Sequence, residues 1–121
     1  MSDRFLHRGK RLDDGGWEFG AVVCADEEFC IYNRGGIIAG EVPIDPATIS
    51  QCTGVRFDGI LIFEGDICVD EDGGIVAIKW NGDGFVGEYV SDGEQIPLMH
   101  FIYLKVIGNI HDNPELLGGI K

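Results

Sequence analysis

The fold is decided by the stretch Ile60-Leu61-Ile62-Phe63-Glu64-Gly65-Asp66-Ile67-Cys68-Val69-Asp70-Glu71-Asp72-Gly73-Gly74-Ile75-Val76-Ala77-Ile78-Lys79-Trp80. Its three apolar runs are separated by Glu64-Gly65-Asp66 and by Asp70-Glu71-Asp72-Gly73-Gly74. Short apolar runs bounded by glycine and acidic residues are typical of strands joined by tight turns. The predicted strands are Ile60–Phe63, Ile67–Val69 and Ile75–Trp80.

The same alternation of apolar runs and Asp/Gly turns extends over the rest of the chain. The further predicted strands are Arg4–Leu12, Trp17–Ala25, Phe29–Asn33, Ile37–Ala39, Phe85–Val90 and Phe101–Ile110. Because side chains alternate along a strand, Trp17 and Phe19 fall on one face together with Ala21 and Val23. Phe101–Ile110 is apolar on both faces, which predicts a strand buried on two sides.

Two short helical turns are also predicted. Asp45-Pro46-Ala47-Thr48-Ile49 has an N-cap acid followed by proline at the first helical position, and Asp112–Leu117 repeats this pattern before Gly118-Gly119. Regularly spaced strands with turns between them favour a sandwich or a small barrel. We therefore predict one mainly β, small barrel-like domain over residues 1–121, with a few short helical turns.

The composition supports a folded domain. The chain has 121 residues, of which 45% are hydrophobic and 25% charged, and nineteen are glycine. No apolar run approaches the roughly 20 residues that cross a bilayer, and the start lacks the apolar stretch of a signal peptide. We therefore expect a cytoplasmic protein without a membrane partner.

The charge is strongly acidic and unevenly distributed. The net charge is −12, and residues 13–72 hold fourteen acidic residues against two arginines. Nucleic acid is disfavoured as a partner, because its phosphates need several Lys or Arg side chains. The basic N-terminal residues leave alternatives open: they could contact phosphates, form a charged edge strand or pair with the acidic remainder. These candidate nucleic-acid-binding residues are Arg4, Arg8, Lys10 and Arg11.

The cysteines indicate reduced thiols. Cys24, Cys30 and Cys68 lie in strand-like apolar stretches, where cysteine usually behaves as a small buried hydrophobe. Cys52 is the one cysteine outside a predicted strand. The spacing lacks the paired ligands of structural zinc sites, so we expect no zinc site.

Residue patterns for catalysis are weak. The serines do not stand in a nucleophile elbow, and the glycines do not fit a phosphate-binding loop. Cys52 could pair with a histidine, but nothing in the sequence indicates which histidine would activate it. Glu64 and Asp66 could hold a cation, although a carboxylate beside a turn glycine more commonly accepts backbone N–H groups. Asp70–Asp72 and Asp26–Glu28 could in principle ligate a hard cation such as calcium or magnesium. Asp70–Gly74 lacks the pattern of an EF-hand loop and is interpreted as a solvated hairpin tip. We therefore predict a protein that is not an enzyme and has no cofactor, metal or catalytic residue.

Four motifs occur in a characteristic order. They are Phe5…Arg8-Gly9-Lys10…Asp13-x-Gly15-x-Trp17-x-x-Gly20, Asp45-Pro46-x-Thr48-Ile49-x-Gln51-x-Thr53-Gly54, Ile62-Phe63-Glu64-Gly65-Asp66-Ile67 and Val106-Ile107-Gly108-Asn109-Ile110-His111-Asp112-Asn113-Pro114-Glu115-Leu116-Leu117. Together they resemble the YopX family of small phage and prophage proteins. The departures are Phe57-Asp58-Gly59-Ile60, where relatives often have a longer polar turn, and Phe63, where tyrosine is common.

The resemblance implies a mainly β domain with barrel-like character, encoded by a phage or prophage and present in the bacterial host cell. It brings no activity and no catalytic or binding residue. The turn Glu64-Gly65-Asp66 before a strand and hairpin also resembles small SH3-like barrels. We expect a non-enzymatic protein-interaction module with an unknown protein partner, which could be homo-oligomeric. The alternatives are a nucleic-acid-binding accessory protein, an acidic DNA mimic acting on a host DNA-binding protein, and a metal-dependent enzyme at Glu64 and Asp66.

Overall fold

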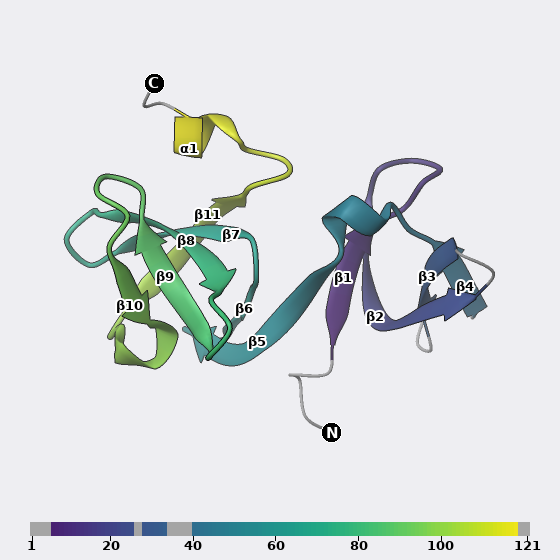
Figure 1. The fold of residues 1–121 in the computed structure, drawn as a ribbon, viewed down its shortest axis with the longest axis horizontal. Coiled ribbons are helices and arrows are strands. Elements are labelled where there is room, and N and C mark those ends of the chain that lie inside the picture. Colours follow the sequence, from purple (N-terminus) through teal and green to yellow (C-terminus); the bar gives the residue numbers. More distant parts are fainter. Residues whose placement is uncertain (1–5, 26–27, 34–39, 119–121) are drawn as a thin grey trace. The chain divides into compact units, whose positions relative to one another are not determined.

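The computed structural model describes residues 6–25, 28–33 and 40–118. It falls into two compact units, Met1–Cys52 and Thr53–Lys121, called here the N-terminal and C-terminal units (Figure 1). Strands dominate both units, which confirms the mainly β prediction. The prediction of a single domain over residues 1–121 stays a prediction.

The first sheet has the strand order β4-β3-β2-β1-β5-β6, and the N-terminal unit holds its strands from β4 to the first part of β5. Its elements are β1 (His7–Lys10), β2 (Trp17–Ala25), β3 (Glu28–Asn33), β4 (Gly40–Pro43), the 3₁₀ turn η2 (Pro46–Thr48) and the first part of β5 (Ser50–Phe57). Ile31, Ile44 and Cys52 are buried. A Cβ at Gly9 would collide with Cγ2 of Ile44, so glycine on β1 gives Ile44 its place in this core.

The C-terminal unit is built around a second antiparallel sheet, in the order β10-β9-β8-β7-β11. Its elements after β5 are β6 (Ile60–Phe63), β7 (Asp66–Asp70), β8 (Ile75–Trp80), β9 (Phe85–Tyr89), β10 (Gln95–Pro97), the 3₁₀ turn η3 (Leu98–His100), β11 (Leu104–Asn109) and α1 (Glu115–Gly118). The helical turns predicted near Pro46 and Pro114 are thus confirmed.

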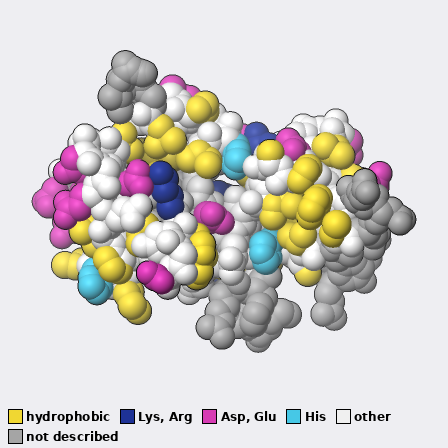
Figure 2. All heavy atoms as spheres, in the orientation of Figure 1, with side chains coloured by type: hydrophobic (Ala, Val, Ile, Leu, Met, Phe, Trp, Pro, Cys, Tyr) yellow, Lys and Arg dark blue, Asp and Glu magenta, His cyan; other side chains and the backbone are white. Residues whose placement is uncertain are grey.

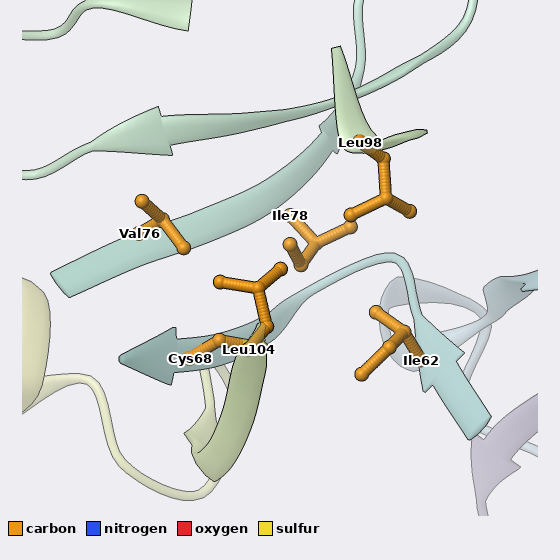
Figure 3. Packing of buried hydrophobic residues seen from close by; sticks show 6 residues of the cluster. All are labelled: Ile62, Cys68, Val76, Ile78, Leu98 and Leu104. Carbon is orange, nitrogen blue, oxygen red and sulfur yellow. The ribbon is translucent and has the colours of Figure 1, made fainter. Parts of the chain in front are cut away.

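One hydrophobic cluster forms the core of the C-terminal unit. Its buried members come from β6, β7, β8, η3 and β11, and their side chains converge in Figure 3. They are Ile62, Cys68, Val76, Ile78, Leu98 and Leu104. These five elements thereby depend on one another for the burial of their apolar surface.

The Glu64-Gly65-Asp66 turn is a structural junction. Gly65 has a φ of +90°, which glycine adopts without steric cost. The backbone N–H of Gly65 donates to the carbonyl of Ile78, and its own carbonyl accepts from the N–H of Ile110, both at 2.9 Å. Buried Asp66 accepts a 2.8 Å hydrogen bond from the N–H of Phe63 through Oδ2. The predicted structural role of this carboxylate is confirmed.

Several sequence-based predictions differ from the structure. Within the described residues neither strand order returns to its first strand, so no closed barrel is found. The prediction that Phe101–Ile110 is buried on both faces is wrong, because β11 is an edge strand in which only Leu104 is buried. Strands β4, β5 and β10 were not predicted, and the predicted strand Ile37–Ala39 lies outside the described residues.

Candidate functional site

The basic residues of β1 contact an aromatic ring on the neighbouring strand. Register pairs Lys10 with Trp17 and Arg8 with Phe19, so the four side chains share one face. Cζ of Arg8 lies 4.7 Å, and Nζ of Lys10 5.5 Å, from the centroid of Trp17. Arg8 is only 8% exposed. Its guanidinium is therefore engaged inside the unit, in an arrangement that favours a cation over an aromatic face.

Arg11 is hydrogen-bonded to two carboxylates, and a third, that of Asp13, has its Oδ1 3.9 Å from Nε. Its side chain donates to Asp14 through Nε and to Glu18 through Nη1, each at 2.8 Å. The hydrogen bond from Arg11 lowers the pKa of Asp14 to about 2, and the hydrogen bonds to Asp14 and Glu18 raise the pKa of Arg11. The structure thus brings Arg8 and Lys10 together and turns Arg11 toward acids. Arg4 lies outside the described residues, and nucleic-acid binding through the four residues stays a prediction.

The cysteine predictions hold in part. All four thiols are free, but Cys24 is exposed and Cys30 half-buried, so the expectation of burial is wrong for these two. Cys52, expected outside a strand, is fully buried in β5. Burial is the main cause that raises the pKa of Cys68 to about 12, and nearby Asp66 adds to it. Buried thiols of this kind are weak nucleophiles.

The structure gives the acidic candidate residues no metal-binding arrangement within the described part of the chain. Among the described residues, no three His, Cys, Asp or Glu side chains gather in a way that could hold a metal ion. Asp26 and Glu27 lie outside the described residues. Asp70 is the N-terminal anchor of its turn, where Oδ1 accepts from the N–H of Asp72 at 2.9 Å and of Gly74 at 2.7 Å.

The most exposed apolar side chains of the described residues lie at η3. Met99 is 81% exposed and Ile102 is 83% exposed. Ile102 lines an open hollow of about 380 Å³ that four carboxylate residues also line. The complete lining is Asp70, Glu71, Asp72, Tyr89, Glu94, Ile96, His100, Phe101 and Ile102. Met99 together with this lining is called the Ile102 surface.

Figure 2 shows the two kinds of side chain of this region together on the C-terminal unit, at the left of the view. Acidic side chains gather over the turn between β7 and β8, and hydrophobic and histidine side chains lie below them over the region of η3. An apolar surface attracts the apolar groups of a partner, and the acidic residues beside it favour a partner with positive charge.

The exposed side chains are presented from a fixed base. Leu98 is buried in the core cluster, and Phe101 packs against the same cluster. The N–H of Phe101 donates to the carbonyl of Leu98 at 3.2 Å, which closes the 3₁₀ turn. A Cβ at Gly87 would lie 2.8 Å from the ring of Phe101, so glycine at this position on β9 makes room for that ring. With two residues anchored inward, Met99 and Ile102 remain at the surface.

A hydrogen bond joins two of the residues that line the Ile102 surface. The hydroxyl of Tyr89 donates to Oδ2 of Asp70 at 2.6 Å. This hydrogen bond is the largest cause that lowers the pKa of Asp70 and that raises the pKa of Tyr89 to about 12. It joins the turn after β7 to the end of β9, and so fixes one wall of the hollow.

Tyr89→Phe is expected to lower the free energy of unfolding by about 1 kcal/mol at neutral pH, the net value of one such hydrogen bond. A lowered carboxyl pKa stabilises the fold above the unfolded-state pKa, and this stabilisation is lost as pH falls through the lower folded-state pKa. The difference in melting temperature from the unsubstituted protein should therefore be full at pH 7 and shrink below about pH 4. It should also shrink as pH rises through the raised pKa of Tyr89, about 12.

The measurement is thermal unfolding followed by circular dichroism across this pH range. Tyr103→Phe removes the same hydroxyl elsewhere in the C-terminal unit and is the matched control. An unchanged difference between pH 7 and pH 3 would contradict the role given to Asp70.

Sequence reasoning missed this surface. It assigned Phe101 and Ile102 to a long buried strand and gave Met99 no role. Pro97 followed by Leu98-Met99-His100 was the available signal, because proline cannot continue an interior strand and commonly opens a turn.

A comparison with protein families matches residues 21–118 to the family described as YopX protein. The chain belongs to the YopX family. The match covers most of both sheets, and it confirms the resemblance carried by the sequence motifs. No match was found among curated proteins. In the part of the chain that the structure describes, no helix has the length and apolar character needed to cross a membrane.

Proposed function

We propose that this member of the YopX family is a non-enzymatic protein-interaction module that docks a basic, amphipathic segment of a partner protein on the Ile102 surface. The observation that carries the proposal is the exposure of Met99 and Ile102, 81% and 83%, beside a hollow lined by carboxylates. Large apolar side chains held in water by a rigid base lose that unfavourable exposure when a partner covers them.

The charge supports a basic partner. Glu71, Asp72 and Glu94 are exposed around the hollow, and residues 53–121 hold twelve acidic and four basic residues. Lys and Arg side chains on the partner would be steered toward this surface and held at its rim. Their long apolar stems can also lie over Ile102 while the charged ends reach the carboxylates.

The same charge disfavours a second copy of the chain at this surface. Two copies would bring like charges together, which opposes association. The expected homo-oligomer therefore remains a separate proposal, for which light scattering after size exclusion at low and high salt is the measurement. Salt screens repulsion between carboxylates, so any self-association through this surface should increase with salt.

The strand order supports a finer proposal about the fold. Strands β7 to β10 follow one another, β11 returns beside β7, and a 3₁₀ turn separates β10 from β11. This order is that of small SH3-like barrels, and we include an SH3-like C-terminal unit in the proposal. The proposal also includes an origin in a phage or prophage and action in the cytoplasm of a bacterial host, which the resemblance of the sequence motifs implies.

The docking proposal is tested by selection from a displayed library of random dodecapeptides. The library is first depleted on the Met99→Ser/Ile102→Ser variant and then selected on the unsubstituted chain, so that retained peptides need the two apolar side chains. We expect retained peptides to combine Lys or Arg with large apolar residues. Synthetic copies should bind at least tenfold more weakly to the double variant when fluorescence anisotropy is measured.

The control is Ile60→Ser, which replaces another exposed isoleucine of the C-terminal unit outside the Ile102 surface. It should leave affinity unchanged. The proposal is overturned when the depleted library yields no binder, or when the binders are acidic. If the chain is instead an acidic DNA mimic, a DNA-binding protein should bind the double variant as tightly as the unsubstituted chain. The affinity of that complex should fall strongly with salt.

A further inference from the structure

A second hollow lies in the N-terminal unit. It has a volume of about 530 Å³, within the range of roughly 300–1,000 Å³ for ligand pockets. Its lining is Leu12, Asp13, Glu28, Phe29, Pro43, Ile44 and Pro46, called here the Phe29 socket. Leu12 is 65% exposed at its margin, whereas Ile44 is buried beneath it. The socket thus has an apolar floor and an open mouth.

Backbone hydrogen bonds join the three segments that form the socket. The N–H of Leu12 donates to the carbonyl of Pro43 at 3.1 Å, and the N–H of Ile44 donates to the carbonyl of Phe29 at 2.9 Å. The N–H of Asp45 donates to the carbonyl of Lys10 at 2.9 Å. The socket is therefore pre-formed, which reduces the ordering that binding would require.

The chemistry of the lining selects its occupant. Five of the seven residues are apolar, and Phe29 with two prolines offers flat surfaces suited to an aromatic ring. The two polar residues, Asp13 and Glu28, are both exposed carboxylates. The lining includes neither Lys nor Arg. Nε of Arg11 lies 3.9 Å from Oδ1 of Asp13, but Arg11 also donates to Asp14 and Glu18, so carboxylates outnumber cations beside Asp13. An aromatic group with a neighbouring positive charge therefore complements both its shape and its charge.

We propose that the Phe29 socket is a second binding site, which takes an aromatic side chain adjacent to a Lys or Arg in an extended partner segment. The site lies within the N-terminal unit and does not rest on the Ile102 surface. Each unit of the chain then carries its own site for a basic partner segment.

The probes are the blocked dipeptides N-acetyl-Phe-Lys-amide, N-acetyl-Phe-Glu-amide and N-acetyl-Gly-Lys-amide. Amide chemical shifts of the full chain are followed by NMR during titration to tens of millimolar. We expect saturable shifts at Leu12, Glu28, Phe29 and Ile44 with the Phe-Lys probe. The Phe-Glu probe should bind at least threefold more weakly, and the Gly-Lys probe should give no saturable shift.

Two variants make the result specific. Leu12→Ser, an exposed substitution, should weaken binding of the Phe-Lys probe at least fivefold, whereas Ile102→Ser should leave the shifts unchanged. The proposal is overturned by the absence of saturable shifts at the socket residues, by equal binding of the Phe-Lys and Phe-Glu probes, or by an unchanged affinity in Leu12→Ser. None of these outcomes bears on peptide binding at Met99 and Ile102, so the two proposals fail separately.

Discussion

Replacing Ile78 by alanine is expected to lower the free energy of unfolding of the C-terminal unit by about 2–5 kcal/mol. Ile78 is 1% exposed and belongs to the core cluster, where it lies among Leu98 and Leu104 in Figure 3. The substitution removes three carbon atoms from a cluster that takes residues from β6, β7, β8, η3 and β11. The loss combines the transfer free energy of these atoms with the cost of the cavity that they leave.

The measurement is urea unfolding followed by circular dichroism. Ile102→Ala makes the same chemical change at an exposed position of the same unit and is the matched control, with an expected change within about 0.5 kcal/mol. Equal effects of the two substitutions would contradict the assignment of Ile78 to the core. Equal effects would also contradict the anchoring of η3 in this core, from which Met99 and Ile102 extend to the surface.

This dependence links the core to the proposed function. Leu98 enters the cluster from η3, so loosening of the cluster would release the turn that holds Met99 at the surface. A core variant is therefore expected to weaken peptide binding indirectly, through the fraction of molecules in which η3 is ordered. Met99→Ser/Ile102→Ser acts directly and should leave the unfolding transition nearly unchanged.

The parts of the fold that the sequence predicted well are bounded by strong turn signals. Strands β6 and β8 begin and end at the predicted residues, because glycine and acidic residues stop each apolar run. Strand β5, Ser50–Phe57, could not be predicted from its sequence, because small and polar residues occupy both of its faces. Its buried positions are Ser50 and Cys52. Burial there comes from neighbouring strands rather than from the apolar character of β5 itself.

The candidate sites were less predictable for a related reason. The sequence shows that residues 96–102 are apolar except for His100, but it does not show which side chains a 3₁₀ turn buries. The burial of Arg8 was equally hard to predict, because its position over Trp17 depends on the register between β1 and β2. Both assignments require contacts that only the assembled strands provide.

Gly9→Ala is expected to destabilise the N-terminal unit by about 1–3 kcal/mol, the usual cost of overpacking a core. The sign is informative, because alanine in place of glycine inside a strand is otherwise favourable by roughly 0.5–1 kcal/mol. At this position the new Cβ would collide with Cγ2 of Ile44 and lie 3.5 Å from Cγ1 of Ile49. The methyl group of a β-branched side chain cannot move aside easily.

Gly84→Ala is the matched control, because an added Cβ there meets nothing within 4 Å. Differential scanning calorimetry measures both variants together with Ile78→Ala. A single domain over residues 1–121 predicts that Gly9→Ala and Ile78→Ala shift one common transition, since two-state unfolding couples the cores of the whole domain. Two transitions, each shifted by only one of the substitutions, would contradict the single domain and assign separate stabilities to the two compact units. A stabilising effect of Gly9→Ala would contradict the close approach of Ile44 to β1, and with it the buried floor of the Phe29 socket.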